Sequence, residues 1–191
     1  LLMDDSLYEL PGFESAKYVC APPLRKKEDQ DCLWKGLADG TIQTVSTDHC
    51  SFTTEQKKLG EGDFTKIPGG MPGAETRGTL IYTYGVDKGR ITKEDMCRVL
   101  SENPAKLYGL YPRKGVIAPG SDADLVIMRT GVEDVITAKD QVQNVDYAPF
   151  EGTKVTGRVE SVFLRGLQAV KDGKVVEEKK GEFLKRGKYA L

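Results

Sequence analysis

The clearest alternation of hydrophobic and polar positions lies between Thr92 and Leu110. Met96, Val99 and Leu100 form an apolar stripe at helical spacing. Thr92 is followed three residues later by Asp95, a spacing that resembles a capping box. This region therefore predicts a helix from Thr92 that is broken at Asn103-Pro104, where the proline can open a second short helix.

A second helix is predicted for residues 26–37. Leu33 and Leu37 lie one turn apart with Trp34 beside them, and Asp39-Gly40 follows as a stop signal. Between these helices, residues 53–78 form a long polar stretch without a clear period. Loops of that length in compact domains are usually functional.

Strands are predicted where β-branched and apolar residues form short runs. The expected strands cover residues 18–20, 41–46, 125–128 and 159–164, the second and third of them buried. Residues 169–171 and 174–176 flank Asp172-Gly173, which predicts a hairpin with a two-residue turn. Residues 179–191 are basic and are expected to fray unless they dock on a partner.

Composition narrows the class of protein. The 191 residues carry 28 basic and 29 acidic side chains, and no basic stripe suggests a nucleic-acid partner. The longest apolar runs are about five residues, against the roughly 20 needed to cross a bilayer, so no membrane association is expected. Four cysteines without a C-x-x-C pair are expected to be reduced thiols, which favours a cytoplasmic protein. The opening LLMDDS suggests a piece of a longer chain.

The sequence leaves open whether Asp48 and His49 bind a metal ion or are ordinary polar residues at the end of a strand. Adjacent residues on a strand point to opposite faces, so these two side chains would not easily ligate one ion together. A catalytic zinc site needs about three protein ligands, and His49 is the chain's only histidine. From the residues alone, an aspartate that caps the turn after a strand remains an alternative to a metal ligand.

Several segments, read in order, resemble one family. They are KYVCAPPLR (residues 17–25), STDHCSF (46–52), GDFTKIPGGMPGAETR (62–77), NPAKLYGLYPRKGVIAPGSDADLVI (103–127) and the DGK hairpin. Together they resemble the C-terminal part of a D-hydantoinase or dihydropyrimidinase of the amidohydrolase superfamily. The fourth segment is common to many amidohydrolases, whereas STDHC and IPGGMPG are typical of the cyclic-amide branch.

The resemblance implies an α/β fold. Residues 1–114 would be the last strands and helices of a TIM (β/α)₈ barrel, residues 115–180 a small β-sandwich-like domain, and residues 181–191 a C-terminal tail. Family members hold two zinc ions through a His-x-His pair, a bridging carboxylated lysine, two further histidines and an aspartate at the end of the eighth strand. Asp48 matches that aspartate, which implies both metal binding and proton transfer as general base and then acid.

Substrate contacts are also implied by the resemblance. In the family, backbone groups near a Ser of a CSPP motif and an Asn of an IPNG motif bind the cyclic amide. The matching positions here are Ala21 and, with a one-residue gap, Gly69. Both depart from the dihydropyrimidinase form, but backbone hydrogen bonds do not depend on the side chain. The IPGGMPG form is more similar to hydantoinases.

The other zinc ligands of the family would lie upstream of Leu1. This chain alone is therefore expected neither to bind two zinc ions nor to hydrolyse hydantoin. In the longer parent, the expected partners are a small-molecule cyclic amide and further copies of the chain, as a dimer or tetramer. The alternative is a non-enzymatic, dihydropyrimidinase-related assembly protein, which the retained Asp48 within STDHC disfavours.

Overall fold

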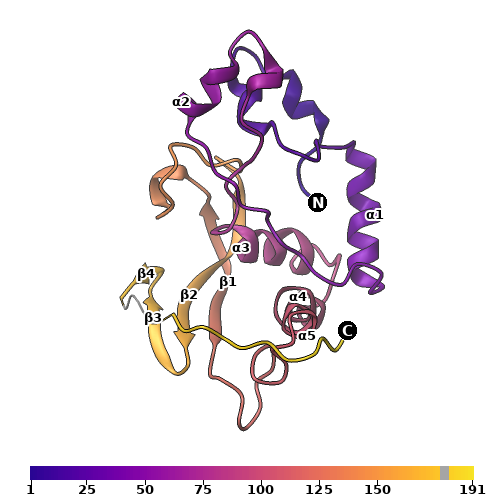
Figure 1. Ribbon diagram of the computed structural model, residues 1–191, viewed down its shortest axis with the longest axis vertical. Helices are drawn as coiled ribbons and strands as arrows, with labels where there is room; N and C mark the ends of the chain where they lie inside the picture. Colours follow the sequence, from indigo (N-terminus) through magenta and orange to yellow (C-terminus); the bar gives the residue numbers. More distant parts are fainter. Residues whose placement is uncertain (177–180) are drawn as a thin grey trace. The chain divides into compact units, whose positions relative to one another are not determined.

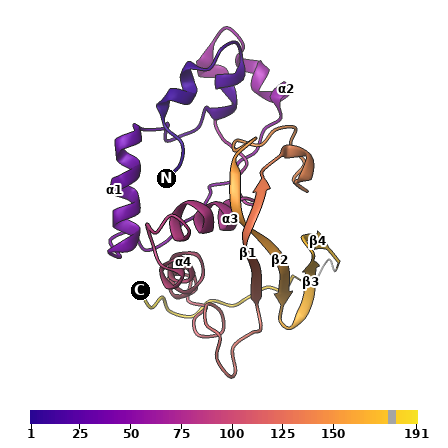
Figure 2. The same cartoon turned by 180° about the vertical axis from the view of Figure 1, so that it is seen from behind.

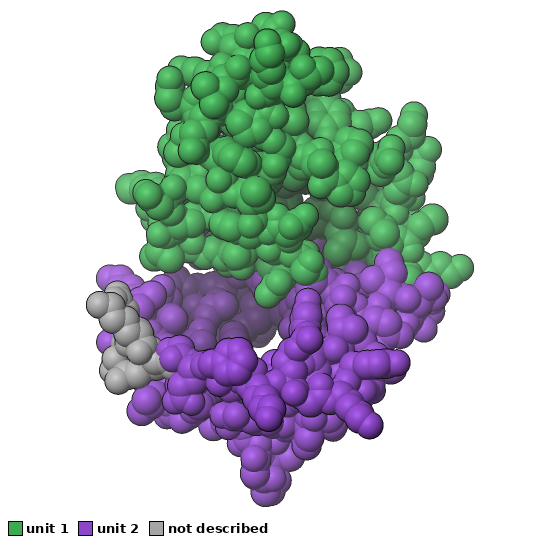
Figure 3. Space-filling view, in the orientation of Figure 1, with its two compact units in different colours: residues 1–36, 46–77, 135–154 green, residues 37–45, 78–134, 155–191 purple. Residues whose placement is uncertain are grey.

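The computed structural model describes residues 1–176 and 181–191, and these fall into two compact units (Figure 3). Unit 1 consists of residues 1–36, 46–77 and 135–154. Unit 2 consists of residues 37–45, 78–134 and 155–191. Each unit is thus assembled from segments that are far apart in the sequence.

Helix α1 spans Lys27–Ala38 and confirms the helix that the leucine spacing predicts (Figure 1). Glu28 and Asp29 lie in its first turn, where acidic side chains interact favourably with the helix dipole. Trp34 and Leu37 are buried on its apolar face, whereas Leu33 is largely exposed. Gly40 follows the helix with a positive φ of 82°, in accord with the predicted stop.

Apart from most of α1, unit 1 contains short helical turns and little regular structure. These are η1 (Asp5–Glu9), η2 (Glu14–Tyr18), α2 (Thr54–Lys57), η3 (Lys58–Gly60), η4 (Phe64–Lys66) and η7 (Ala138–Asp140). The strand predicted at residues 18–20 is wrong, because Tyr18 ends η2 and no ladder forms at these residues. The Val19 carbonyl instead accepts hydrogen bonds from Gly70 N and Lys57 Nζ.

Unit 2 holds two helical rods, and the sequence patterns predict one of them. α3 (Arg77–Ile81) runs on into the π-helical segment η5 (Tyr82–Val86), a helix that the patterns miss. α4 (Lys93–Cys97), η6 (Arg98–Glu102) and α5 (Asn103–Leu107) follow one another in the predicted helical region. The Thr92–Asp95 capping box is present in full. The predicted break at Asn103-Pro104 is wrong, since the wider π turn of η6 accommodates the proline and Asn103 keeps helical φ and ψ.

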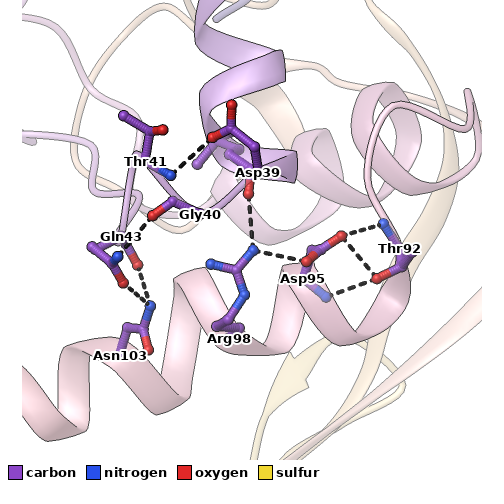
Figure 4. Close-up of polar contacts among 9 residues, drawn as sticks. Asp39, Gly40, Thr41, Gln43, Thr92, Asp95, Arg98 and Asn103 are labelled. Carbon is purple, nitrogen blue, oxygen red and sulfur yellow. Dashed lines mark hydrogen bonds and ion pairs between the residues drawn. The ribbon is translucent and has the colours of Figure 1, made fainter. Parts of the chain in front are cut away.

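The α4–α5 rod holds the segment after α1 in place (Figure 4). Asn103 Nδ2 donates to the Gln43 carbonyl at 2.8 Å, and Arg98 donates to the Leu37 carbonyl at 2.9 Å. Val45 N donates to the Val99 carbonyl at 3.0 Å. The strand predicted at residues 41–46 is therefore wrong. The backbone of this segment forms hydrogen bonds with residues of the α4–α5 rod and not with a neighbouring strand among the described residues.

The sheet has the strand order β1-β2-β3-β4 and is visible from both sides (Figures 1 and 2). Its strands are β1 (Leu125–Val135), β2 (Lys154–Leu164), β3 (Leu167–Lys171) and β4 (Lys174–Val175). The predicted strands at residues 125–128 and 159–164 are confirmed but are shorter than those observed. The expected burial of residues 125–128 is wrong: Val126 is 61% and Ile127 48% exposed.

Two hairpins with two-residue turns join the last three strands. Val170 pairs with Val175 around Asp172-Gly173, whose φ values of 50° and 74° confirm the predicted hairpin. The turn at Arg165-Gly166, with φ values of 50° and 82°, joins β2 to β3 and was not predicted. The described residues form this single sheet, so the second layer of a β-sandwich is not seen in them.

Strand β2 packs on the helix that the sequence patterns miss. Thr156 N donates to Thr83 Oγ1 at 3.1 Å. A side chain at Gly157 would come within 2.4 Å of the Tyr82 ring, so glycine permits this close approach. Val155 and Ser161 are buried on the same strand.

The C-terminal tail docks within unit 2 instead of fraying. Gly187 N donates to the Gly109 carbonyl at 2.7 Å, and Ala190 N donates to the Lys106 carbonyl at 3.0 Å. The basic pair Lys179-Lys180 lies outside the described residues. None of the helices in the described ranges has the length and apolar character required to span a bilayer.

Candidate functional site

Three segments of unit 1 meet around the ammonium group of Lys57. This group donates to the carbonyls of Val19 at 3.0 Å, Pro68 at 2.7 Å and Gly70 at 2.9 Å. Gly70 N also donates to the Val19 carbonyl at 2.9 Å. Two of the segments that resemble hydantoinases, residues 17–25 and 62–77, are thereby fastened to each other.

Lys57 is fully buried, with 0% of its residue surface exposed. It lies at the end of α2, which opens with a capping box between Thr53 and Gln56. Burial lowers the pKa of Lys57, while the nearby thiols of Cys20 and Cys50 act in the opposite direction. Its three hydrogen bonds use all the donors of an ammonium group, which offsets the cost of burying the charge.

The segment after Thr47 joins the same cluster through Gly70. Cys50 N donates to the Met71 carbonyl at 3.2 Å. A side chain at Gly70 would place its Cβ 2.3 Å from the Cys50 carbonyl oxygen, and the Gly70 φ of 153° is unfavourable for other residues. Only glycine allows residues 50 and 70 to approach this closely.

Asp48 is exposed and has a φ of 47°, in the left-handed region. Among the described non-glycine residues, only Asp48, Arg165 and Asp172 have a positive φ. The other two occupy hairpin turns that require it. Asp48 lies in no hairpin, so a hairpin turn does not explain its positive φ, and such uncommon backbone conformations are concentrated at functional sites.

His49 takes a structural role through one of its ring nitrogens. Its Nδ1 accepts hydrogen bonds from Gly73 N at 3.0 Å and Ala74 N at 3.2 Å. This lone pair is therefore engaged by the backbone of the IPGGMPG segment. His49 thus anchors this segment beside Asp48, and its Nδ1 is not free to bind a metal.

Ala21 and Gly69, the two expected substrate-binding positions, lie next to each other. Both are exposed. An ideal Cβ at Gly69 would lie 4.0 Å from Ala21 N and 4.0 Å from Cys20 Cα. The fold therefore brings together two backbone stretches that are almost 50 residues apart in the sequence.

The donor groups of the described residues do not complete a metal centre. No cluster of three or more His, Cys, Asp and Glu side chains that could hold a metal ion occurs within residues 1–176 and 181–191. Asp48 offers a carboxylate oxygen, which zinc accepts as a ligand. The described residues therefore offer Asp48 as a candidate ligand, and a binuclear zinc centre would need further ligands from elsewhere. All four cysteines are free thiols.

Sequence reasoning missed Lys57 altogether. Residues 53–78 carry no hydrophobic period, and a lysine in such a stretch normally belongs to a solvated surface. One signal was available: Thr53 with Gln56 three residues later has the capping-box spacing, which indicates a helix start just before Lys57. Nothing in the pattern indicates that Lys57 points inward.

Comparison with known proteins places this geometry in a family. The model of the amidohydrolase family matches residues 13–176. The D-hydantoinase of Geobacillus stearothermophilus is 50% identical over 191 residues, which cover 99% of this chain and 41% of that protein. The D-hydantoinase of Streptomyces coelicolor is 49% identical over 170 residues, which cover 88% of this chain and 36% of that protein.

Solved structures agree with this likeness. The D-hydantoinase from Bacillus sp. AR9 superposes with a TM-score of 0.97 at 46% sequence identity. The match covers 100% of this chain and 42% of the hydantoinase chain. The dihydropyrimidinase from Brevibacillus agri gives 0.97 at 45% identity, with the same coverage. The chain thus spans about two fifths of the length of the relatives it matches. It belongs to the amidohydrolase family and resembles the C-terminal portion of a D-hydantoinase.

Proposed function

We propose that this chain is the C-terminal part of a zinc-dependent cyclic amidase. The whole enzyme hydrolyses the ring amide of hydantoins or dihydropyrimidines to N-carbamoyl amino acids. The exposed Asp48, whose backbone has a positive φ and which lies within a motif shared with the cyclic-amide branch, carries this proposal. The high identity to D-hydantoinases over almost the whole chain supports it.

In this proposal Asp48 is both a metal ligand and the residue that moves the proton. Zinc ions, when bound, supply a nucleophile at neutral pH and polarise the substrate carbonyl. The Asp48 carboxylate takes a proton from the attacking oxygen as general base. It then gives that proton to the ring nitrogen that leaves, as general acid.

The cyclic amide is bound through backbone groups at Ala21 and Gly69. These positions suit a planar ring with alternating N–H and C=O groups, because neighbouring stretches of backbone offer both donors and acceptors. Neither position presents a polar side chain, so recognition depends on how the peptide groups are oriented. The IPGGMPG form supports hydantoins as the preferred substrates.

The rest of the assignment follows the same family pattern. Residues 1–114 form the end of the TIM barrel, residues 115–180 the small β domain and residues 181–191 the tail. The intact protein, meaning this chain together with the remainder of the hydrolase, is cytoplasmic and forms a homo-oligomer. Its free cysteines are consistent with a reducing compartment.

The activity is tested by ring opening in the intact protein. The purified zinc-loaded protein is assayed with 5-substituted hydantoins and with dihydrouracil, before and after removal of metal by a chelator. We expect hydrolysis of both rings, faster for hydantoins, and loss of both activities on metal removal. If the zinc-loaded protein opens neither the hydantoin ring nor the dihydrouracil ring, the proposal is contradicted.

The 191-residue chain alone is expected to be inactive. It carries a single histidine, whereas the proposed centre needs several. Zinc content and hydantoin turnover are measured on the isolated chain. Two bound zinc ions per chain, or robust turnover without added partner, would contradict the assignment of the remaining ligands to another part of the protein.

A further inference from the structure

We propose that Lys57 is a positioning residue for substrate recognition, because it sets the orientation of the peptide groups on both sides of Gly69. This inference rests on the proposed function, in which Gly69 contacts the cyclic amide. Lys57 itself lies fully buried behind the exposed backbone of Gly69 and does not contact substrate.

The peptide group before Gly69 is oriented by Lys57 directly. The Pro68 carbonyl accepts from Lys57 Nζ at 2.7 Å, the shortest of the three hydrogen bonds of this ammonium group. In a trans peptide, the N–H points opposite to the C=O. The Gly69 N–H is therefore directed away from the buried ammonium group.

The peptide group after Gly69 is oriented through a shared acceptor. Gly70 N donates to the Val19 carbonyl, which also accepts from Lys57 Nζ. The Gly69 C=O, on the opposite side of the same peptide, is directed away from Val19. Lys57 also holds the Gly70 carbonyl at 2.9 Å. Its three bonds thus set the direction of both polar groups of Gly69.

The same arrangement extends to the second substrate-binding stretch. Because the Val19 carbonyl points to Lys57, the backbone that leads through Cys20 to Ala21 starts from a fixed direction. An ideal Cβ at Gly69 lies 4.0 Å from Ala21 N. One buried cation therefore sets the relative placement of two stretches that carry no polar side chain for the ring.

An ammonium group supplies the several hydrogen-bond donors that this position needs. Three carbonyl oxygens converge within 3.0 Å of one point, and their negative ends repel one another. An ammonium group supplies three donors and a positive charge, whereas a neutral side chain of the same length supplies neither. Without it, the carbonyls would rotate towards other donors and carry the Gly69 peptide groups with them.

The test compares three variants in the zinc-loaded intact protein. Lys57→Met removes the ammonium group at similar length, and Lys57→Arg keeps the charge in a planar group that cannot reach three separate carbonyls equally well. Lys114→Met is the matched control, since Lys114 is a second poorly exposed lysine, bound to Asp122 and Asp124 in unit 2. The measured quantities are kcat and KM for a 5-substituted hydantoin.

We expect Lys57→Met to raise KM about tenfold while kcat changes less than about threefold, because binding of the ring is what depends on Gly69. Lys57→Arg gives a smaller rise in KM, a partial rescue that a purely structural role would not produce. Lys114→Met leaves KM unchanged. The inference is overturned if neither Lys57 variant changes KM more than Lys114→Met does.

Hydrogen exchange separates this inference from the proposed function. Mass spectrometry follows the backbone amides of Ile67, Gly69, Gly70 and Met71 in the same proteins. We expect exchange there to be at least about tenfold faster in Lys57→Met, and unchanged in Lys114→Met. If the wild-type protein opens no cyclic amide, the proposed function fails, yet the exchange rates still decide whether Lys57 orients this segment. Unchanged exchange in both Lys57 variants overturns the inference whatever the activity.

Discussion

Two lysines with little exposure, Lys57 and Lys114, are held in opposite ways. Lys57 binds three backbone carbonyls in unit 1. Lys114 binds the carboxylates of Asp122 and Asp124 in unit 2. Burial lowers the pKa of Lys57. Burial also acts to lower the pKa of Lys114, but its hydrogen bonds and charge interactions with Asp124 and Asp122 together raise it.

The difference shows what each cation does for the fold. Carboxylates neutralise the charge of Lys114, but they are side chains that can adjust their rotamers. Carbonyls leave the charge of Lys57 uncompensated, but each one belongs to a peptide plane that the hydrogen bond orients. A lysine among carbonyls therefore stiffens the backbone. Around Lys57 in unit 1, where the helices are only three to five residues long, this is a substitute for regular secondary structure.

The largest loss of stability is expected from Gly70→Ala, whose new side chain would clash with the backbone of Cys50 near Lys57. The new Cβ would lie 2.3 Å from the Cys50 carbonyl oxygen at a φ of 153°. Strain and overpacking together should lower the free energy of unfolding by about 4 kcal/mol. Urea denaturation of the intact protein measures this.

Gly120→Ala is the control in the region of Lys114. Gly120 also has a positive φ, of 91°, but a side chain there would meet nothing within 4 Å. We expect a loss of about 1 kcal/mol, from backbone strain alone. Equal losses for the two alanine variants would show that the backbone around Lys57 is no more tightly packed than a surface turn.

Lys57→Met is expected to have the next largest effect on stability. It leaves three carbonyls without their buried donor and should cost about 3 kcal/mol of unfolding free energy. Lys114→Met should cost less, since its carboxylate partners are partly exposed and can be hydrated. The comparison fails if the two methionine variants have the same denaturation midpoint.

The pH dependence of stability should have opposite signs at the two lysines. With its folded-state pKa below the ordinary 10.5, Lys57 binds fewer protons in the folded state, so its contribution to stability rises with pH up to about 10.5. Lys114 has a raised pKa, so its contribution is complete below 10.5 and is lost as pH rises through the folded-state value. The unfolding free energy of each methionine variant is subtracted from that of the wild-type protein at each pH between about 8 and 11. The tyrosines titrate in variant and wild type alike, so their contribution cancels and the slope that belongs to each lysine remains. Slopes of the same sign would contradict the assignment.

Local signals in the sequence were sufficient where a segment satisfies its own backbone. The helix at residues 26–37 is observed at Lys27–Ala38, and the hairpin at Asp172-Gly173 has the predicted turn. In both cases the hydrogen bonds close within a few residues, so spacing and turn chemistry are enough. The Thr92–Asp95 capping box is found for the same reason.

The failures occur where distant groups satisfy the backbone. Residues 18–20 and 41–46 read as strands, but their carbonyls and amides bind Lys57, Gly70, Val99 and Asn103. Lys57 donates hydrogen bonds to three carbonyls that are 11, 13 and 38 residues away in the sequence. No periodicity reports such contacts. The family motifs identify Asp48, Ala21 and Gly69 as candidates, but not the lysine behind Gly69.

The central claim is that the Asp48 carboxylate moves the proton in ring opening, and Asp48→Asn in the intact protein tests it most directly. Asparagine keeps the size and the tolerance of a positive φ but cannot act as a base. Asp39→Asn is the control, since Asp39 also bears an exposed carboxylate and accepts a hydrogen bond from Thr41 N, which an amide oxygen can replace. We predict that Asp48→Asn lowers kcat for a 5-substituted hydantoin by at least about a thousandfold, while Asp39→Asn retains wild-type turnover. Hydantoin turnover by Asp48→Asn within a few fold of wild type would contradict the account.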